Sequence, residues 1–598
     1  MTEVFSRLLA AATEHWADLK TRPWIRVSTG MMGTASGVRD TLSALRHDIT
    51  HSGVQATISE VGTTGLCYAE PLVDVYMPGG ARILYANLGP ERVPEIVERH
   101  IKGGEPVVEM ALASVDSDVP GLPRREHLPM MQHQVRIALR NAGEVEPANL
   151  NHYIARGGFS GLDKALSEMQ PDQVVQEVRD SGLRGRGGAA FSTGTKWGFL
   201  AGNPSPTKYI LCNCEEGDPG AFNDKTILDT DPLTLIEGCL IAGYATGSSN
   251  GIVFIRHGHD SPIERTRAAI KTCYDNGILG RRVMGTDFSF DIEISLVGES
   301  YVAGEETALM EAVEGKRSMP RFRPPFPAAY GVWGKPSNIN NIKTISYVPE
   351  IIRRGAAWFN SIGTEKSAGT AIACLSGDIR YPGLVEVPFG LTMRQVVEDL
   401  GGGDPDGRPI KFLQTGGPLG GVLPAEQLDL VLDYDAMAAA GAMFGSGGLI
   451  VCNDTRSVVD LVRNLLAFDQ MESCGKCFPC RLGTSHLLEV LDRICAGESR
   501  DGDMNLMARI GANLRAGSLC GHGQLGYNPV ESALKNFSDE FLAQMSGNGV
   551  IPIAPFVGPL TTRRGAQANG ATPTATVKLD FVVKLEPAAL SIAAPEVD

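Results

Sequence analysis

Four cysteines near the end of the chain have a spacing that suits an iron–sulfur cluster. Cys474, Cys477 and Cys480 stand at every third position, and Cys520 follows much later in the segment SLCGHG. Thiolates spaced in this way can bind three corners of a cubane, and one distant thiolate can bind the fourth. Zinc sites more often pair two short cysteine or histidine motifs, and cysteines buried in a core need no such spacing. We therefore predict a 4Fe-4S site here, and we interpret most other cysteines as core residues: Cys212, Cys214, Cys239, Cys273, Cys374, Cys452 and Cys495.

A second group of residues could bind a phosphate. The segment GLRGRGGAAFSTGTKW, residues 182–197, begins with four glycines in seven positions and also carries basic residues. Glycines let a backbone approach an anion closely, and Ser192 or Thr193 can cap a helix whose N-terminus would face that anion. Because no strand immediately precedes the loop, a phosphate site and a plain flexible loop are equal alternatives on these residues alone.

Two acidic segments could contact other parts of a ligand. The turn CNCEEGDPGAFNDK, residues 212–225, starts at the end of the strand-like KYIL and is more acidic than folding requires. Ligands of α/β proteins bind at the carboxyl ends of strands, although acidic turns are more often simply solvated. The segment SYVAGEETALMEAVEGKR, residues 300–317, places Gly304, Glu305 and Glu306 at a predicted helix start, and alone it is ambiguous.

The elements that must position these residues follow from the hydrophobic periodicity. At the N-terminus, short strands and amphipathic helices alternate as in a small α/β unit. Between 205 and 300, strands such as KYILCN and GIVFIRHG alternate with helices, which favours a wound sheet, and one helix is expected to begin near Asp231 and Pro232. Residues 370–450 are rich in glycine and β-forming residues, whereas 455–542 have a helical pattern.

Composition narrows the classes of function. A formal net charge of −15 argues against nucleic acid as a partner, because such partners need a basic surface. The N-terminus lacks a basic start followed by an apolar segment, and no apolar run is long enough for a transmembrane helix. The 12 cysteines are too unevenly spread for a disulfide framework, and clustered cysteines are typical of metal binding in a reducing compartment. We expect a cytoplasmic protein with no direct membrane insertion.

Taken in order, six motifs resemble one protein family. They are GRGGAAFSTGTKW, NCEEGDPGAFND, YVAGEETAL, EGKRSMPRFRPPFP, GKPSNINN, and ESCGKCFPCR with SLCGHGQ, and they span roughly residues 150–540. The chain resembles the 51 kDa-type flavin subunit of the NADH dehydrogenase family. That family includes respiratory complex I and the diaphorase subunits of soluble NAD-linked formate dehydrogenases and hydrogenases. The resemblance implies FMN, NAD(H) and one 4Fe-4S cluster as cofactors.

The resemblance also implies an α/β multidomain architecture. Its expected parts are a thioredoxin-like domain without a cluster at 1–105, a linker at 106–150, a Rossmann-like FMN- and NADH-binding domain at 151–368, a β-rich ubiquitin-like insert of the soluble-ligand-binding type at 369–452, a helical bundle carrying the 4Fe-4S cluster at 453–542, and a C-terminal tail at 543–598. In related subunits the N-terminal domain binds a 2Fe-2S cluster through four cysteines. Matching that pattern to VSTGMMGTASG and GTTGLCYAEPLV places Ser28, Gly33, Thr63 and Cys67 there. Only one thiol remains, so we predict a domain retained for docking.

The same resemblance assigns the site residues. The implied cofactor-binding positions are Gly185, Arg186, Gly187, Gly188, Ala189, Phe191, Lys196, Phe199, Asn213, Glu215, Glu216, Asp218, Tyr301, Gly304, Glu305, Glu306, Arg323, Phe326, Asn340 and Asn341, with Cys474, Cys477, Cys480 and Cys520 as the metal ligands. Of these, Asp218 and Glu306 are the catalytic candidates. Amide and lysine groups suit phosphate, aromatic rings suit adenine, and carboxylates accept ribose hydroxyls, although the phenylalanines alone would more often be core residues. The chain departs from the family at Glu215 and Asp218, where aspartate and glutamate are usual, and at Lys343, where glutamate is usual.

The expected function follows from this set of cofactors. Hydride would pass from NADH to FMN and single electrons would pass to the 4Fe-4S cluster, or the reverse in the intact enzyme, which makes the chain an NADH:acceptor oxidoreductase. The fused N-terminal domain favours a soluble multisubunit enzyme of the formate dehydrogenase, hydrogenase or bifurcating type. Its partners would be a small thioredoxin-like 2Fe-2S subunit and a larger iron–sulfur catalytic subunit. Two alternatives stay open: a respiratory complex I flavin subunit, and a non-catalytic electron-transfer or scaffold subunit that has lost NADH binding.

Overall fold

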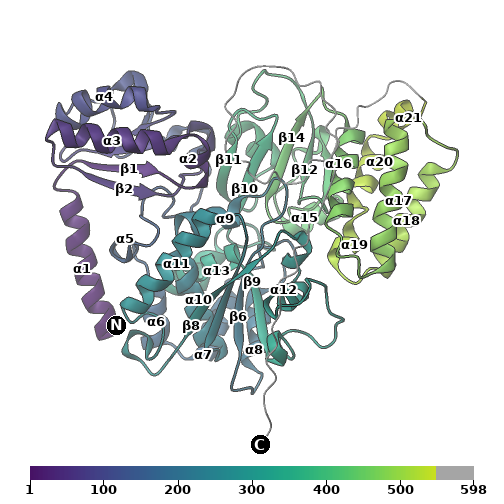
Figure 1. Ribbon diagram of the computed structural model, residues 1–598, viewed down its shortest axis with the longest axis horizontal. Coiled ribbons are helices and arrows are strands. Elements are labelled where there is room, and N and C mark those ends of the chain that lie inside the picture. The colour runs from purple at the N-terminus through teal and green to yellow at the C-terminus, as the bar shows by residue number, and fades with distance from the viewer. Residues whose placement is uncertain (547–598) are drawn as a thin grey trace, which may run out of the picture. The chain divides into compact units, whose positions relative to one another are not determined.

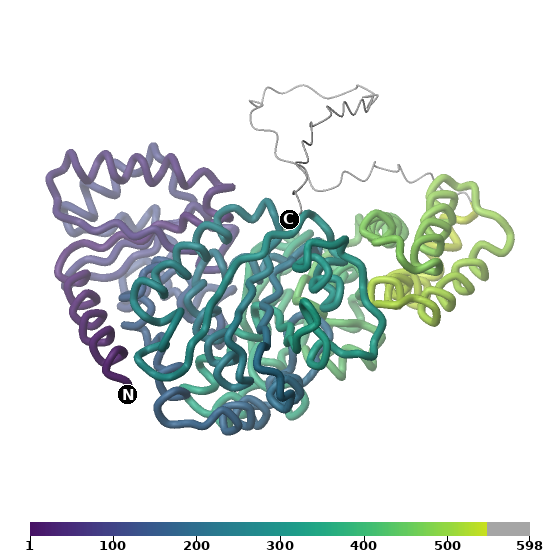
Figure 2. Tube along the Cα trace, turned by 60° about the horizontal axis from the view of Figure 1, so that its bottom comes forward, coloured from purple at the N-terminus to yellow at the C-terminus, as the bar shows by residue number. Residues whose placement is uncertain are grey.

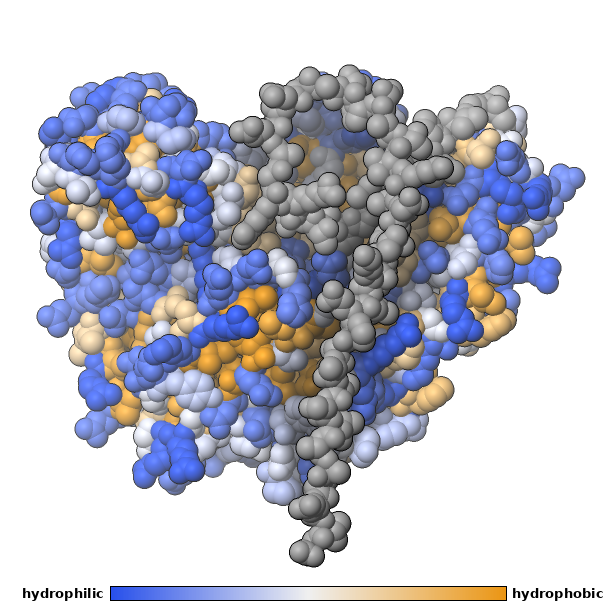
Figure 3. All heavy atoms as spheres, viewed as in Figure 1, coloured by the Kyte–Doolittle hydropathy of each residue, from blue (hydrophilic) through white to orange (hydrophobic). Residues whose placement is uncertain are grey.

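The computed structural model describes residues 1–546 of the chain. Within them, three β-sheets and a final group of helices follow one another along the chain, as the labels of Figure 1 show. The predicted α/β multidomain fold class is thereby confirmed. Polar side chains cover much of the face drawn in Figure 3, as expected of a chain in which 21% of the residues are charged. The predicted tail lies almost wholly outside the described residues.

The N-terminal unit is built on a five-stranded sheet with the strand order β2-β1-β3-β4-β5. β1 pairs in parallel with β2, and β3 runs antiparallel to both β1 and β4, which is the arrangement expected of a thioredoxin-like unit. The elements are α1 (Glu3–Leu19), β1 (Trp24–Ser28), α2 (Met31–Ala35), α3 (Val38–Ser52), β2 (Thr57–Val61), β3 (Val73–Tyr76), β4 (Ile83–Tyr85), α4 (Val93–Glu95), a π-helical segment (Ile96–Lys102) and β5 (Ala111–Ser114).

β5 departs from the expected division of the chain. Residues 106–150 were predicted to be a linker, yet β5 lies within them and pairs with β4 to complete the N-terminal sheet. Further along, the N–H groups of Ala138 and Leu139 donate to the buried carboxylate of Glu386 in β11 (Gly383–Pro388), at 3.1 and 2.8 Å. A strand this short gives too brief a hydrophobic pattern to be recognised. The segment is thus part of two folded units.

The middle unit is a wound sheet of four parallel strands. Successive residues of β6 face opposite cores, because Ile210 packs with α10 and α13 whereas Leu211 packs with α12. As predicted, Asp231 caps α10, and Pro232 is its first residue. The elements are α5 (Leu150–Ala155), α6 (Ser160–Glu168), α7 (Pro171–Asp180), α8 (Thr193–Ala201), β6 (Tyr209–Cys214), α9 (Asn223–Thr230), α10 (Pro232–Thr246), β7 (Asn250–Arg256), α11 (Asp260–Asp275), β8 (Asp291–Val297), α12 (Glu306–Val313), β9 (Ser337–Asn341), α13 (Ile342–Arg354) and α14 (Ala356–Asn360).

The order of these strands creates a place for a ligand. The sheet has the order β8-β7-β6-β9, so the chain moves from β6 to β7 and β8 on one side and then returns to place β9 on the other side of β6. Open parallel sheets bind ligands outside the carboxyl ends of the strands at such a reversal. β6 ends at Cys214, so its last three residues are the first three of the acidic segment 212–225, and β9 ends at Asn341. Two predicted site segments therefore meet at this crevice.

The insert and the C-terminal helices complete the described chain. The insert is a five-stranded mixed sheet with the order β11-β10-β14-β12-β13, and Figure 2 shows the last helices as yellow-green coils. None of the helices among residues 1–546 combines the length and apolar character that a membrane span needs. The elements are β10 (Thr370–Gly377), β11, β12 (Ile410–Thr415), β13 (Gly421–Pro424), α15 (Tyr434–Ala439), β14 (Gly448–Asn453), α16 (Val458–Met471), α17 (Phe478–Cys495), α18 (Asp503–Gly517), α19 (Gly521–Leu525), α20 (Asn528–Asn536) and α21 (Ser538–Met545).

Candidate functional site

The glycine-rich loop lies directly against the crevice. The N–H of Gly185 donates to the carbonyl of Phe191 (2.8 Å), which folds the loop back on itself before α8. Gly188 has φ +111°, a conformation that a side chain would strain. A Cβ at Gly187 would lie only 2.9 Å from the Cβ of Asn341 at the end of β9. Glycine is therefore required for the close approach of this loop to the sheet.

Two basic residues of the loop have different partners. The buried guanidinium of Arg186 donates to the carbonyls of Ala368 (2.6 Å) and Thr370 (3.2 Å), where the insert begins. Its side chain is therefore committed to the fold, and these contacts do not support the expected role of that side chain at the cofactor. Lys196, in contrast, donates to the carboxylate of Glu306 (2.9 Å) and stays partly exposed at the crevice.

The first two glutamates of the acidic turn are held by other parts of the protein. Glu215 forms a buried ion pair with Arg256 at the end of β7 (3.1 Å). Burial raises the pKa of Glu215 to about 8, although Arg256 pulls it the other way. Glu216 accepts the N–H groups of Asp224 and Lys225 (both 2.8 Å) and so caps the start of α9. Arg256 was not predicted, and its position at a strand end is the signal that could have found it.

Asp218 is the carboxylate of the turn that is best placed to meet a ligand. Its Oδ2 accepts from the hydroxyl of Ser446 (2.6 Å), whereas its buried Oδ1 has no hydrogen-bond partner among residues 1–546. Burial raises the pKa of Asp218 to about 6, against the effect of the Ser446 hydrogen bond. A buried acceptor without a donor is costly, so a ligand that supplies a donor would stabilise it. Sequence reasoning missed Ser446, which stands in the glycine-rich stretch GSGG of the insert.

A buried lysine ties the acidic turn to the end of β9. Nζ of Lys343 lies 2.7 Å from Oδ1 of Asn223 and 2.9 Å from Oδ1 of Asp224, and Nδ2 of Asn341 donates to Oδ2 of Asp224 (2.6 Å). Burial opposes the charged form, but Asp224 and Glu216 raise the pKa of Lys343, so the lysine carries a positive charge. The glutamate that the family resemblance leads us to expect at this position would add a third carboxylate, whereas Lys343 balances Asp224 and Glu216.

The segment that precedes α12 approaches the same crevice. Nδ2 of Asn213, near the end of β6, donates to the carbonyl of Gly304 (2.8 Å). Glu305 caps α12 through Oε2, which accepts from the N–H groups of Thr307 (3.0 Å) and Ala308 (2.9 Å), so that oxygen is used within the fold. Glu306 accepts from Arg323 (2.8 Å) as well as from the lysine of the glycine-rich loop. The structure thus brings both catalytic candidates and most of the predicted polar positions to one region.

The predicted aromatic contacts are exposed rings. Phe191, Phe199 and Phe326 expose 53%, 60% and 59% of their surface. They are therefore not core residues, and rings left exposed in this way can stack on a planar ligand. Of the remaining predicted positions, Ala189 is exposed in the glycine-rich loop and Asn340 is buried in β9.

Tyr301 connects the crevice to the cysteine segment. Its N–H donates to the carboxylate of Glu472 (2.8 Å), the residue that opens the motif ESCGKCFPC. The Tyr301 ring packs on the rings of Phe468 and His522, with centroids 5.4 and 5.8 Å away. His522 follows closely on Cys520 in the sequence. The crevice and the cysteine segment therefore share direct contacts.

Three of the four predicted metal ligands lie at the starts of two helices that meet, and Cys474 lies in the loop before the first of them. Cys477 directly precedes α17, Cys480 is in its first turn, and Cys520 directly precedes α19. The N–H of Leu519 donates to Sγ of Cys477 (3.3 Å), and a Cβ at Gly523 would lie 3.0 Å from the Cβ of Cys480. Helix N-termini and backbone N–H groups favour the negative charge of thiolates.

Four thiols, three of them at every third position, are a donor set that suits a cubane. Over the part of the chain that the structure describes, no three His, Cys, Asp or Glu side chains converge closely enough to hold one metal ion. A cubane instead binds each thiolate to a different iron, so its ligands stay apart. Cys480 and Cys520 are buried, whereas Cys474 and Cys477 are partly exposed. The exposed side of the site is thus the loop around Cys474 and Cys477.

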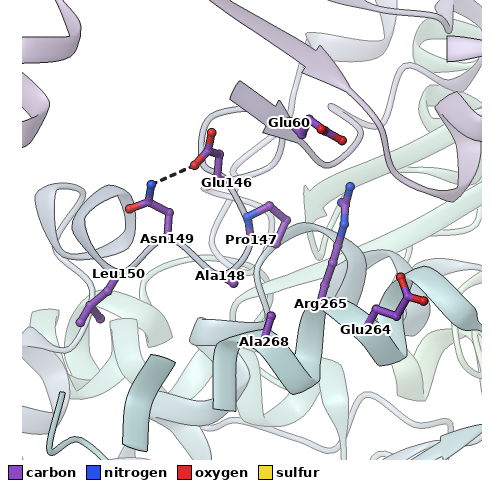
Figure 4. A pocket seen from close by; sticks show the side chains of 9 residues that line it. All are labelled: Glu60, Glu146, Pro147, Ala148, Asn149, Leu150, Glu264, Arg265 and Ala268. Atoms are coloured by element: carbon purple, nitrogen blue, oxygen red, sulfur yellow. Dashed lines mark hydrogen bonds between the residues drawn. The ribbon is translucent and has the colours of Figure 1, made fainter. Parts of the chain in front are cut away.

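A cavity of about 660 Å³ lies apart from all of these residues (Figure 4). The side chains of Glu146 and Asn149, which line it, hydrogen-bond to one another (2.9 Å), and Arg265 pairs with Asp229. No predicted site residue lines this cavity. Glu146, Asn149 and Arg265 thus have partners within the fold, and we assign no ligand to this cavity.

The N-terminal positions matched to cluster ligands surround a buried carboxyl group instead. Oγ of Ser28 donates to Glu70 (2.6 Å), and burial raises the pKa of Glu70 to about 7. A Cβ at Gly33 would lie 1.9 Å from the Ser28 carbonyl oxygen, so a cysteine does not fit there without movement of the backbone. These contacts support a domain without a cluster, which stays a prediction.

Two family models and several known proteins match parts of this chain. The family model described as the Nuo51 FMN-binding domain matches residues 178–350, and the NADH-ubiquinone oxidoreductase-F iron-sulfur binding region matches residues 460–544. NADP-reducing hydrogenase subunit HndC of Solidesulfovibrio fructosivorans is 44% identical over 412 residues, which cover 69% of this chain and 84% of that protein. The F 2 subunit of the NADH-quinone oxidoreductase of Rhizobium meliloti is 41% identical over 409 residues, with 68% and 97% covered.

A solved structure extends the likeness to the N-terminal unit. A chain in the crystal structure of an NAD+-reducing NiFe-hydrogenase in the H2-reduced state matches with a TM-score of 0.62 at 28% identity, covering 88% of this chain and 84% of that one. The two family models cover the segments that hold the crevice and the four cysteines. The chain therefore belongs to the family of flavin- and iron–sulfur-binding subunits of the NADH dehydrogenase module, which includes the F subunits of NADH-quinone oxidoreductases.

Proposed function

We propose that this chain is the diaphorase subunit of a multisubunit oxidoreductase and exchanges electrons between NAD(H) and an iron–sulfur partner. The observation that carries the proposal is the contact between two sites. The crevice at the end of β6 and β9 holds the glycine-rich loop and Asp218, and the pair Tyr301 and Glu472 joins it to the four-cysteine segment. When bound, FMN takes up hydride as a two-electron unit and releases electrons singly, as an iron–sulfur cluster requires.

The residues of the crevice fit a flavin nucleotide. The backbone N–H groups around Gly187 and Gly188, together with Lys196, supply the donors that a phosphate needs. Asp218 offers one buried acceptor oxygen without a partner among the described residues, which suits an N–H or O–H of the bound nucleotides. The exposed ring of Phe199 would stack on a base and exclude water.

Asp218 and Glu306 would act by orienting the bound nucleotides. Hydride transfer requires two rings in close contact, and it does not require the protein to remove a proton. The contribution of these two carboxylates to the rate would therefore be to position the nucleotides. Glu306 is already fixed between Lys196 and Arg323, with both contacts shorter than 3 Å (2.9 and 2.8 Å). A carboxylate held in this way loses little conformational freedom when it accepts a hydroxyl.

The proposed function also requires partner subunits. We propose a small thioredoxin-like 2Fe-2S subunit and a larger iron–sulfur catalytic subunit, in an enzyme of the formate dehydrogenase, hydrogenase or bifurcating type. The N-terminal unit would serve in docking, because its loops already contact the middle unit: the N–H of Met31 donates to Asp229 (2.6 Å), and Arg265 donates to Thr29 (2.9 Å). The cytoplasmic location stays a prediction.

The activity can be tested on the purified chain loaded with FMN. We expect NADH-dependent reduction of ferricyanide, and we expect Asp218→Ala to lower kcat/KM about tenfold or more, since a well-placed carboxylate hydrogen bond contributes about 1.5 to 3 kcal/mol. The matched control is Glu365→Ala, which removes an exposed carboxylate outside the crevice. FMN bound at full occupancy without any reduction of ferricyanide would support the scaffold alternative and refute the proposal.

A further inference from the structure

Two serine side chains stand beside the cysteines of the predicted cluster site. Ser473 directly precedes Cys474, and Ser518 stands two residues before Cys520. Neither serine is a predicted ligand, because a cubane of this type binds thiolates. A hydroxyl group next to a metal ligand can still act on the metal centre through a hydrogen bond to the ligand atom.

The hydroxyl group of Ser473 is placed to donate to a cysteine sulfur. Its Oγ lies 3.3 Å from Sγ of Cys480 and accepts the N–H of Gly475, also at 3.3 Å. Because that N–H occupies one lone pair of the oxygen, the hydroxyl hydrogen is free to point toward the sulfur. A metal ligand is a thiolate and has no hydrogen to give, so Ser473 is the donor of this pair when iron is bound.

The hydroxyl group of Ser518 is buried and has no hydrogen-bond partner among residues 1–546. A Cβ at Gly523 would overlap this oxygen and would lie 3.0 Å from the Cβ of Cys480, so the hydroxyl group and Cys480 adjoin the same point of α19. Burying a hydroxyl group without an acceptor is costly. A sulfur atom of a bound cluster would supply the missing acceptor.

We propose that Ser473 and Ser518 donate hydrogen bonds to sulfur atoms of the 4Fe-4S cluster and thereby raise its reduction potential. Reduction adds one electron and one negative charge to the cluster, and a hydrogen bond to sulfur stabilises the more negative state. The hydroxyl groups keep their protons, so no proton is transferred in this step. The inference rests on the proposed function, in which the four-cysteine site takes up single electrons from the crevice. The two serines bind no iron themselves, and they favour uptake of an electron by the site over its return.

The test is a potentiometric titration of the full chain loaded with FMN and the cluster, with dithionite as the reductant and redox mediators present. The electron paramagnetic resonance signal of the reduced cluster gives its midpoint potential. The variants are Ser473→Ala, Ser518→Ala and the double variant, and Ser473→Thr keeps a hydroxyl group at the first position. The matched control is Ser485→Ala, which removes a hydroxyl group of α17 that donates to the carbonyl of Arg481 (3.1 Å) instead of to a cysteine.

Each alanine variant should lower the equilibrium constant for reduction of the cluster about tenfold, which is a fall of about 59 mV in the midpoint potential of a one-electron couple. The double variant should fall further than either single variant. Ser473→Thr and Ser485→Ala should resemble the unaltered chain. The N–H of Leu519, which donates to Cys477, is present in every variant, so the comparison isolates the hydroxyl groups. Iron and sulfide contents show which variants hold a full cluster.

Four outcomes would overturn the inference. They are an unchanged midpoint potential in an alanine variant that holds a full cluster, a fall in Ser473→Thr as large as that in Ser473→Ala, an equal fall in Ser485→Ala, and loss of the cluster from both single alanine variants. The last outcome would make the two serines part of the support of the cysteines. If only one alanine variant loses its cluster, the midpoint potential of the other decides.

The midpoint potential is measured without NADH, because dithionite supplies the electrons. Failure of NADH-dependent ferricyanide reduction would instead refute the proposed function. The failure of this inference and the failure of the proposed function are therefore distinguishable.

Discussion

Replacing Lys343 by Met should destabilise the middle unit strongly. The change removes the cation that lies 2.7 Å from Asn223 and 2.9 Å from Asp224, and it leaves the buried carboxylates of Asp224 and Glu216 without that compensation. Breaking a buried pair by removing one partner costs about 3 to 5 kcal/mol. In a domain of about 200 residues this corresponds to a fall in the melting temperature of about 6 to 20 °C.

The assay is differential scanning fluorimetry, with hydrogen exchange at α9 and α13 to locate the effect. Adding Asp224→Asn to Lys343→Met should recover part of the loss, because the second change removes the unpaired charge. Lys208→Met is the matched control, since Lys208 is also a buried lysine but donates only to backbone carbonyls. Asp224→Asn should not rescue it. A Lys343→Met variant as stable as the unaltered chain, or a double variant weaker than the sum of the single changes, would refute the reasoning.

Three further outcomes test other parts of the structure. Cys477→Ala should lower the iron content, because one cluster ligand is lost, and an iron assay that finds no change would refute the metal site. Phe199→Ala should raise the KM for NADH about tenfold while stability changes by less than about 0.5 kcal/mol, since its ring is exposed. Burial raises the pKa of Glu70 from 4.5 to about 7, so the stability that its protonated form adds is complete below pH 4.5 and is lost as the pH rises through 7. Denaturation at several pH values should show the free energy of unfolding fall by about 3 kcal/mol over this range, and Glu70→Gln should remove that fall.

Local patterns predicted the elements well, because they depend on residues that are close in sequence. The Asp231 and Pro232 signals marked the start of α10, and Ser192 caps α8 as one of the two candidates. The rule that ligands bind at the carboxyl ends of strands was applied to the acidic turn alone, and the structure places Asn341, at the end of the neighbouring strand β9, within hydrogen-bond distance of Asp224 in that turn (2.6 Å). The short strand β5 was missed because four residues carry almost no periodicity.

The directions of side chains depend on contacts that are distant in sequence, and these could not be predicted. Arg186 stands in a loop that suits phosphate, yet its partners are carbonyls far along the chain. Ser446 reaches Asp218 from the insert, at a separation that no local pattern reports. Lys343 was noticed only as a departure from the family, and its role became clear once Asp224 was seen beside it. Such contacts are set by tertiary packing rather than by propensity.

The anchoring of Arg186 bears on how this protein can be shortened or recombined. Its guanidinium binds the backbone oxygens of residues 368 and 370, so a fragment that stops before residue 368 would leave the glycine-rich loop without both contacts. Main-chain oxygens are present whatever the side chain, so the start of the insert can diverge in sequence without loss of this contact. Evolution is therefore free to exchange one insert for another of the same backbone path, but not to delete it.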